Sequence, residues 1–287
     1  MTGLPRFFTE YQDRVSAELH RIVPGKDSAV ERAMAYTALA PSKQVRAVLV
    51  LLCAELCRGS AARAVPVAAS IELVHASSLI LDDLPSMDDA PLRRGRPSNH
   101  IESGEAVAIL AAFGLLNLAY ATIAGAYDAA MAVRMTSIVA DAVGPAGLIG
   151  GQALDLRATD RDITFEALER IHRGKTGALF VAAAACGAVT AGAAEESIAA
   201  LSAYAKNLGL AFQIVDDLLD VAGDPSETGK AVLADARKTT FVSFSGVEGA
   251  RQLAAELCET ADRALSPFGA KADRLRELSA FVAARRL

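Results

Sequence analysis

Two apolar segments of the chain each end in a cluster of aspartates, and this pair of clusters constrains the fold more than any other feature. The first segment, LILDDLPSMDDAPLRRGRPSNH, covers residues 79–100, and the second, LGLAFQIVDDLLDVAGD, covers residues 208–224. Neighbouring carboxylates repel one another, and the C-terminal end of a helix disfavours anions, so each cluster needs a counter-cation. One cationic ligand can neutralise both clusters if the two segments lie in one helical bundle with their aspartates directed toward that ligand.

The first cluster combines acids with a basic rim. Its charged residues are Asp82, Asp83, Asp88, Asp89, Arg93, Arg94 and Arg96. Carboxylate oxygens suit Mg²⁺, which shares its coordination shell with waters and phosphate oxygens. Adjacent arginines suit bidentate binding of a diphosphate. Taken alone, the segment is also compatible with a solvated acidic loop.

The second cluster favours the metal–diphosphate interpretation. It contains Asp216, Asp217 and Asp220, with Gln213 one helical turn earlier. Asp216 and Asp220 are four residues apart, so they share one face of a helix. Two acidic clusters that each follow an apolar helix predict a clamp around a metal–diphosphate.

Helical spacing dominates the rest of the chain. Phe8, Tyr11, Val15 and Leu19 recur near the helical period. Aromatic residues make up only 5% of the chain and Trp is absent, which favours closely packed, Ala-rich helices over a β-sandwich. The apolar segments run nearly end to end with no linker between them. Residues 1–287 are therefore predicted to form one all-α domain, a single large helical bundle around a central cavity.

Composition excludes several classes of protein. Hydrophobic residues make up 52% of the chain, which excludes a disordered protein, and a net charge of −5 argues against a nucleic-acid partner. The four cysteines form no disulfide framework and complete no zinc site, so they are expected to be reduced. The first residues contain no long apolar run, so no signal peptide and a cytoplasmic location are expected.

Two stretches could be mistaken for membrane spans. They cover residues 106–127 and 177–194. A helix that is apolar on all sides is also typical of the centre of a large soluble bundle. Because charged motifs flank both stretches, we interpret them as central helices and expect no transmembrane segment.

Both aspartate clusters resemble the aspartate-rich motifs of trans-isoprenyl diphosphate synthases, as DDLPSMD at residues 82–88 and DDLLD at residues 216–220. Further segments match the same family in order along nearly the whole chain: PSKQVR, GGQALDL, HRGKTGALF, GDPSETGK and RKTTF. The spacing of the first motif and the run VHASSLILDD resemble bacterial geranylgeranyl diphosphate synthases of carotenoid-type pathways. The resemblance implies the isoprenoid synthase fold, a homodimer, and Mg²⁺ with three ions in each site.

The same resemblance implies roles for individual residues. The metal-bridging acids are Asp82, Asp83, Asp88, Asp216, Asp217 and Asp220. The positions that hold the allylic diphosphate (dimethylallyl, geranyl or farnesyl) are Arg93, Lys175 and Lys230. The positions of the isopentenyl diphosphate site are Lys43, Arg46, His75 and Arg94. Other active-site positions are Thr176, Gln213 and Lys238. Asp89 receives no role.

One segment departs from the family pattern. Where the family usually reads GGKRxRP, this chain reads PSKQVRA, so Gln44 stands in place of an Arg and Ala47 in place of a Pro. Lys43 and Arg46 are retained three residues apart, where they can share a helix face and converge on one phosphate. This departure is compatible with an active enzyme that binds isopentenyl diphosphate more weakly.

The reaction that the resemblance implies is a head-to-tail 1'-4 condensation of isopentenyl diphosphate with an allylic diphosphate. Ionisation of the allylic substrate needs an apolar cavity that excludes water. We expect the growing tail to run along the helix before Asp82, where Ser77 and Ser78 leave room for a product longer than farnesyl, namely geranylgeranyl diphosphate. Phe113 or Tyr120 is the candidate floor of this tunnel.

Three alternatives stay open. A farnesyl diphosphate synthase would differ in tunnel depth, a class I terpene cyclase would not need the isopentenyl site, and a non-catalytic partner subunit would have lost acids from one motif. A di-iron site is disfavoured because the chain contains a single ExxH pattern, from Glu169 to His172. Gly150 and Gly151 are expected to permit a close approach between helices.

Overall fold

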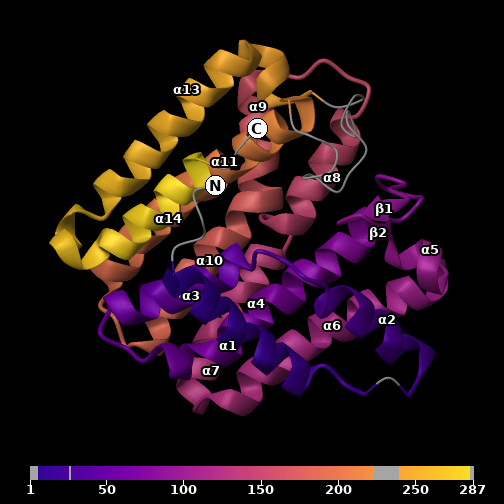
Figure 1. The fold of residues 1–287 in the computed structure, drawn as a ribbon, viewed down its shortest axis with the longest axis horizontal. Helices are drawn as coiled ribbons and strands as arrows, with labels where there is room; N and C mark the ends of the chain where they lie inside the picture. The colour runs from indigo at the N-terminus through magenta and orange to yellow at the C-terminus, as the bar shows by residue number, and fades with distance from the viewer. Residues whose placement is uncertain (1–5, 26, 223–238, 285–287) are drawn as a thin grey trace.

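The computed structural model describes residues 6–25, 27–222 and 239–284. Within these ranges the chain forms helices and one short hairpin, which confirms the predicted all-α class (Figure 1). The first elements are α1 (Arg6–Ile22), α2 (Ala29–Ala38), α3 (Val45–Leu56), α4 (Ala61–Asp82), β1 (Leu92–Arg93), β2 (Arg96–Pro97), α5 (Asn99–Ser103), α6 (Glu105–Ala126) and α7 (Ala129–Val143). The later elements are α8 (Leu148–Ala158), α9 (Phe165–His172), η1 (Arg173–Gly177), α10 (Ala178–Thr190), α11 (Glu195–Ala222), α13 (Phe241–Ala264), η2 (Ser266–Ala272) and α14 (Asp273–Ala283).

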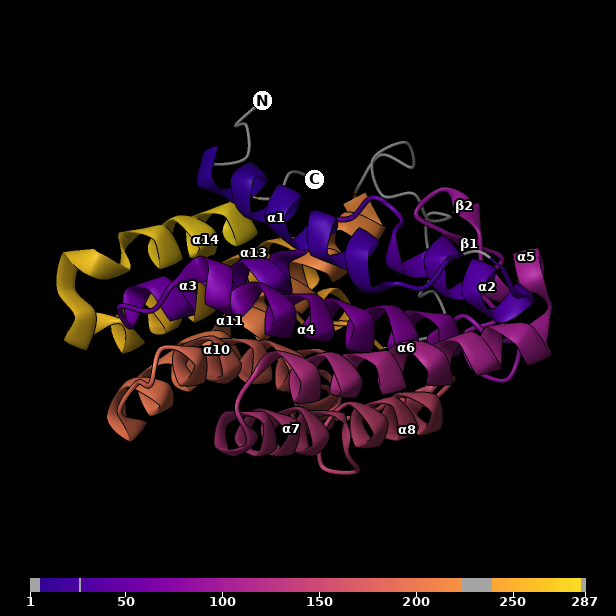
Figure 2. The same ribbon diagram turned by 90° about the horizontal axis from the view of Figure 1, so that it is seen from below.

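The helices are stacked in layers. Figure 2 shows α1 and α14 on one side of the molecule, α7 and α8 on the opposite side, and α3, α4, α10 and α11 between them. The apolar stripe predicted for α1 faces inward, since Phe8, Tyr11, Val15 and Leu19 are all buried. The layered arrangement leaves α3, α4, α10 and α11 in the middle, whereas α6, which the sequence predicts to be a central helix, has an apolar window that is only 33% buried.

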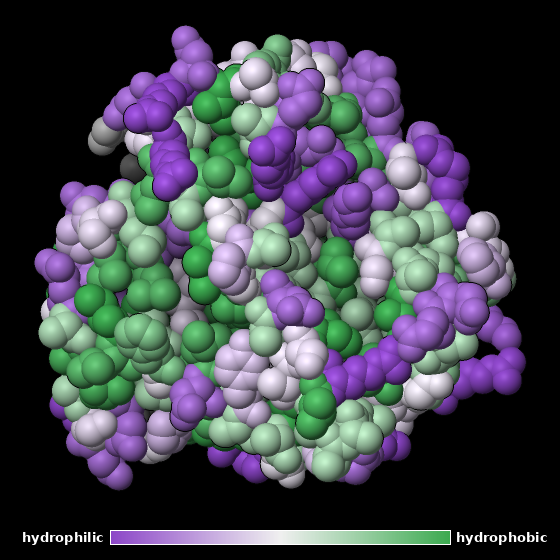
Figure 3. All heavy atoms as spheres, turned by 180° about the vertical axis from the view of Figure 1, so that it is seen from behind, coloured by the Kyte–Doolittle hydropathy of each residue, from purple (hydrophilic) through white to green (hydrophobic). Residues whose placement is uncertain are grey.

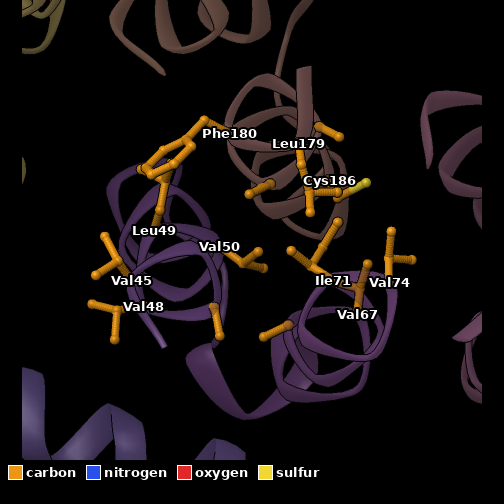
Figure 4. Packing of buried hydrophobic residues seen from close by; sticks show 14 of the residues in the cluster. Val45, Val48, Leu49, Val50, Val67, Ile71, Val74, Leu179, Phe180 and Cys186 are labelled. Atoms are coloured by element: carbon orange, nitrogen blue, oxygen red, sulfur yellow. The ribbon is translucent and has the colours of Figure 1, made fainter. Parts of the chain in front are cut away.

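The main hydrophobic core joins α3, α4 and α10. Leu49 of α3, Ile71 of α4 and Phe180 of α10 are buried together (Figure 4). Gly187 lets α10 approach α3 closely, because a Cβ atom at this position would lie 2.3 Å from the carbonyl oxygen of Val50. Gly187 thus lets the backbones of α10 and α3 lie close together.

A second, smaller core lies among α9, α11 and α13. Leu168, Ile214 and Phe241 are buried in it, and Leu257 of α13 packs against both cores. Leu257 therefore connects the two packing units. The single-domain organisation of residues 1–287 stays a prediction.

The hairpin of β1 and β2 is a feature that helical periodicity did not predict. Its two turn residues, Arg94 and Gly95, have φ angles of 54° and 72°. Positive φ at both central positions is typical of a type I′ turn, which suits the twist of a two-residue hairpin. Arg93 and Arg94 therefore lie at a sharp turn, and they do not share one face of a helix.

Four described helical segments are long and apolar enough to cross a membrane by length and composition. They are residues 61–82, 105–126, 129–158 and 195–221. The apolar window of the first is 67% buried inside the protein, whereas that of the second is only 33% buried. Helices α6 and α7 thus expose much of their apolar surface, and the face on which they lie carries broad apolar areas (Figures 2 and 3).

Candidate active site

The first aspartate cluster lies where α4 ends. Asp82 is the last residue of the helix, and the chain then turns back, so that the backbone N–H of Asp88 donates to the carbonyl oxygen of Asp82 at 2.9 Å. Burial raises the pKa of Asp82, Lys175 opposes this rise, and the charges of Asp88 and Asp83 add to it. The cluster is therefore a crowded group of acids that favours a bound cation.

Asp83 is turned into the protein and pairs with Arg93. Nε of Arg93 donates to the two carboxylate oxygens at 3.0 and 3.1 Å, and a second guanidinium nitrogen donates to Oδ1. The side chain of Asp83 is only 3% exposed. Burial by itself would lower the pKa of Arg93, but the hydrogen bonds and charge of Asp83 raise it overall. This pair fixes the hairpin to the end of α4.

A π-helical turn connects the two aspartate clusters. In this turn, η1, Nζ of Lys175 lies 2.7 Å from Oδ2 of Asp155 and 3.9 Å from Oδ2 of Asp82. The neighbouring hydroxyl of Thr176 donates to Oε1 of Gln213 on α11 at 2.8 Å. Consecutive residues of η1 therefore reach toward both clusters. Single π-helical turns occur frequently at functional sites.

Glycines bring α8 against this turn. A Cβ atom on Gly151 would lie 2.1 Å from the backbone nitrogen of Lys175, and one on Gly174 would lie 2.8 Å from the carbonyl oxygen of Gly147. The close helix approach predicted for Gly151 is therefore present. It places Asp155 of α8 within reach of the Lys175 ammonium.

The second cluster divides into buried and accessible acids. Nε2 of Gln213 donates to Oδ1 of Asp217 at 3.0 Å, and the backbone N–H of Phe241 donates to its Oδ2 at 3.0 Å. Asp217 is thus 4% exposed and ties the start of α13 to α11. Asp216 and Asp220 are half-buried and share the other face of α11.

A second group of basic side chains gathers between α3, α4 and the hairpin. Nη1 of Arg46 lies 3.5 Å from Nε2 of His75, and Arg94 lines a small polar pocket together with His75 and Glu72. Burial lowers the pKa of His75 well below its usual value, and the charges of Arg46 and Arg94 lower it further. His75 is therefore neutral near pH 7, and its imidazole has one N–H group that can donate a hydrogen bond to an anionic ligand.

The loop before α3 carries the departure from the family pattern. Lys43 is exposed, and Gln12 of α1 holds its loop by donating to the carbonyl oxygen of Lys43 at 2.9 Å. Gln44 adopts the left-handed conformation with φ 48°, and its Nε2 donates to Oγ of Ser16 on α1 at 3.0 Å. The side chain of Gln44 thus lies between α1 and the start of α3. Lys230 and Lys238 lie outside the described residues.

The acids that flank the site fit a metal bound jointly with a phosphate. Among the described residues, no three His, Cys, Asp or Glu side chains form a ready-made metal cluster. The accessible acids stand instead in two groups, at the end of α4 and on α11. Mg²⁺ usually takes one or two carboxylates and completes its shell with waters and substrate phosphates, so this division suits it.

Comparison with known proteins decides the family. The model of the family described as polyprenyl synthetase matches residues 27–265. The chain belongs to this polyprenyl synthetase family. It is 40% identical over 284 residues to geranylgeranyl pyrophosphate synthase 11 of Arabidopsis thaliana. This alignment covers 95% of this chain and 80% of the plant protein.

Two further relatives support the same family. The chain is 42% identical over 250 residues to the farnesyl diphosphate synthase of Escherichia coli, and the alignment covers 85% of this chain and 84% of that protein. It superposes with a TM-score of 0.85 on a Helicobacter pylori geranyltransferase in complex with magnesium and isoprenyl diphosphate, at 29% identity. That alignment covers 98% of this chain and 97% of the other.

The structure adds two site residues that the sequence analysis did not predict. Asp155 contacts Lys175, and Glu72 lies beside Arg94 in the polar pocket. Each is an acid in the interior of a mostly apolar helix, which is an unusual placement for a charged residue. A charged residue in such a position suggests a role in a site, but the sequence does not indicate which cation it pairs with.

The residues expected to line the product tunnel lie in different surroundings. Oγ of Ser77 donates to the carbonyl oxygen of Ala112 at 2.8 Å, so Ser77 is turned toward α6, whereas Ser78 is half-buried on the face of Asp82. Phe113 is 63% exposed on the outside of α6. The expectation that Phe113 floors a tunnel is therefore wrong within a single chain, because α6 turns this side chain outward.

Proposed function

We propose that this protein condenses isopentenyl diphosphate with allylic diphosphates, dimethylallyl, geranyl and farnesyl, and that geranylgeranyl diphosphate is its main product. The observation that carries the proposal is the position of η1 between the two aspartate clusters. Lys175 lies 3.9 Å from Asp82, and Thr176 bonds Gln213, which in turn bonds Asp217. A separate small pocket is lined by His75 and Arg94, and Arg46 lies 3.5 Å from His75; these three side chains are the proposed second diphosphate site. Two such sites are what a condensation of two diphosphates needs.

The accessible acids are assigned to the metal. We propose that Asp82 and Asp88 on one side and Asp216 and Asp220 on the other hold Mg²⁺ together with the allylic diphosphate. Three ions per site, as the family resemblance implies, are part of this proposal. Bound Mg²⁺ would neutralise the diphosphate charge as it leaves. Asp83 and Asp217 act on the same site through the hairpin and the start of α13 that they hold.

The cationic residues divide between the two substrates. Lys175 and Arg93, with Lys230, would bind the allylic diphosphate, and the ammonium of Lys175 stabilises the negative charge that develops as the C–O bond breaks. Arg46, His75 and Arg94, with Lys43, would hold isopentenyl diphosphate so that its double bond faces the allylic carbon. The apolar helices around the site exclude water, which would otherwise quench the cationic carbon.

The experiment that tests the function is product analysis. The protein is incubated with isopentenyl diphosphate, one allylic primer at a time and Mg²⁺, and the chain length of the product is determined by chromatography. We expect geranylgeranyl diphosphate from each primer and loss of activity on addition of EDTA. Farnesyl diphosphate as the end product would favour the alternative function, a farnesyl diphosphate synthase, which the Escherichia coli relative represents. Cyclised product would indicate a terpene cyclase.

Product length should respond to the helix face below Asp82. Ser78 lies four residues before Asp82, so it shares that face, and Ser78→Phe should shorten the main product to farnesyl diphosphate. Ser77→Phe should also shorten it, but with a loss of stability of about 1–3 kcal/mol because its ring overpacks the contact with α6. Product analysis beside thermal melting distinguishes the effects. Unchanged product lengths in both variants would contradict the tunnel along α4.

We also propose that the protein is a cytoplasmic homodimer without a transmembrane segment. Ile109, Leu110 and Phe113 of α6 are 36%, 55% and 63% exposed and form an apolar face that a second copy can cover. Light scattering should give a mass near twice 29.9 kDa, and Phe113→Glu should shift it toward the monomer. A monomeric wild-type protein would contradict this proposal.

A further inference from the structure

Helix α4 buries one acid that belongs to neither aspartate cluster. Glu72 is 7% exposed and lies ten residues before Asp82. Burial raises the pKa of Glu72, and the charges of Arg46 and Arg94 oppose that rise. A buried carboxylate is costly unless hydrogen bonds and opposite charges compensate the lost hydration. The partners of Glu72 therefore indicate what it does.

The first partner is the N-terminal end of α3. The backbone N–H of Ala47 donates a hydrogen bond of 3.1 Å to Oε1 of Glu72. Ala47 lies in the first turn of α3, where backbone N–H groups find no acceptor within the helix. Gln44, the residue before the helix, provides no side-chain cap. Glu72 thus caps α3 from a neighbouring helix, and its negative charge is favoured at that positive end.

The other partners are two guanidinium groups. Arg46, next to Ala47, stacks on the rings of Phe180 and Phe212 with distances of 4.7 and 5.8 Å from Cζ to the ring centroids. Arg94 lines the same pocket as Glu72. Burial lowers the pKa of Arg94, and the charge of Glu72 opposes this. Glu72 therefore offsets the repulsion between two cations that must lie close together to bind one diphosphate.

We propose that Glu72 is a positioning residue for the isopentenyl diphosphate site, which fixes the first turn of α3 against α4 and thereby sets the places of Arg46 and Arg94. This inference rests on the proposed function. An anion would repel the substrate, so Glu72 acts through the two arginines and not by contact. The hydrogen bond exists because Ala47 occupies a place where the family usually has Pro, which has no N–H to donate.

The test separates the two substrates. Glu72→Gln keeps a side-chain carbonyl as acceptor for Ala47 but removes the charge, and Glu72→Leu removes both. We expect Glu72→Gln to raise the KM for isopentenyl diphosphate about tenfold and Glu72→Leu to raise it further. The KM for the allylic diphosphate and the kcat at saturation should change less than about twofold. Arg46→Ala serves as the reference for a direct loss at this site.

A matched control is available on α3, the helix that Glu72 caps. Glu55, in the last turn of α3, accepts hydrogen bonds from Tyr11 and Arg274, so Glu55→Gln should lower the melting temperature without changing either KM. If wild-type protein forms no condensation product, the proposed function fails and this inference fails with it. If wild-type protein is active but Glu72→Gln keeps its KM for isopentenyl diphosphate, or raises both KM values equally, the inference alone is wrong.

Discussion

Replacing Asp82 by Ala should lower the turnover number by about three orders of magnitude while the protein stays folded. Asp82 stands at the end of α4, where the charges of Asp83, Asp88 and Arg93 act on it and the Lys175 ammonium lies 3.9 Å away. Removal of its carboxylate would weaken Mg²⁺ binding, so the negative charge of the departing diphosphate would be neutralised less well. The fold should persist because the change relieves repulsion among buried acids. Asp216→Ala, on α11, should have a similar effect.

The measurement is steady-state turnover at saturating Mg²⁺ and substrates, beside thermal melting. Asp89 provides a matched control in the same loop, since it is exposed and has a φ of 46°, a conformation that Asn also tolerates. Asp89→Asn should therefore keep wild-type turnover. Full activity of Asp82→Ala would remove the two-cluster clamp from the proposed mechanism.

Arg93→Ala should destabilise the protein by about 3 kcal/mol, in addition to any effect on substrate binding. The loss follows because Asp83, whose side chain is 3% exposed, would keep a buried charge without its guanidinium partner. Asp83→Asn in the same chain should recover part of that stability, since a neutral amide is less costly to bury than an unpaired carboxylate. Urea unfolding of the four proteins of this double-mutant cycle gives the coupling free energy.

The control for this cycle is an exposed pair. The side chains of Arg134 and Glu195 are 44% and 75% exposed, so Arg134→Ala should change the free energy of unfolding by less than about 1 kcal/mol. An Arg93→Ala variant that is as stable as Arg134→Ala would show that the Asp83 pair does not hold the hairpin. Arg93 would then be assigned to the substrate alone.

The sequence by itself determined the helical class and the two acidic clusters. Both are local properties: apolar residues at helical spacing specify helices, and adjacent aspartates keep their chemistry wherever they are placed. The resemblance of the motifs was equally readable along the chain, and the family comparison confirmed it. The close approach at Gly151 could also be predicted, because a glycine pair before a polar helix face suggests contact with another backbone.

Only the tertiary structure decided which acids are accessible. Along the chain the six aspartates of the two motifs look equivalent, yet Asp83 is paired with Arg93, and Asp217 receives N–H groups from Gln213 and Phe241. A partner such as Phe241 lies 24 residues away, and no local pattern specifies such a contact. Burial and pairing of a charge depend on which helices pack together.

The hairpin gives the same lesson for the basic residues. Arg93 and Arg94 are neighbours in sequence, but a turn with positive φ sends Arg93 to Asp83 and Arg94 to the pocket of His75 and Glu72. In the sequence Glu72 is an isolated acid in a mostly apolar helix. Its hydrogen bond with Ala47 is apparent only from the packing of α3 against α4. Sequence fixes which charges exist. The packing of distant segments decides which of them meet, because the cost of burying a charge depends on its neighbours in space.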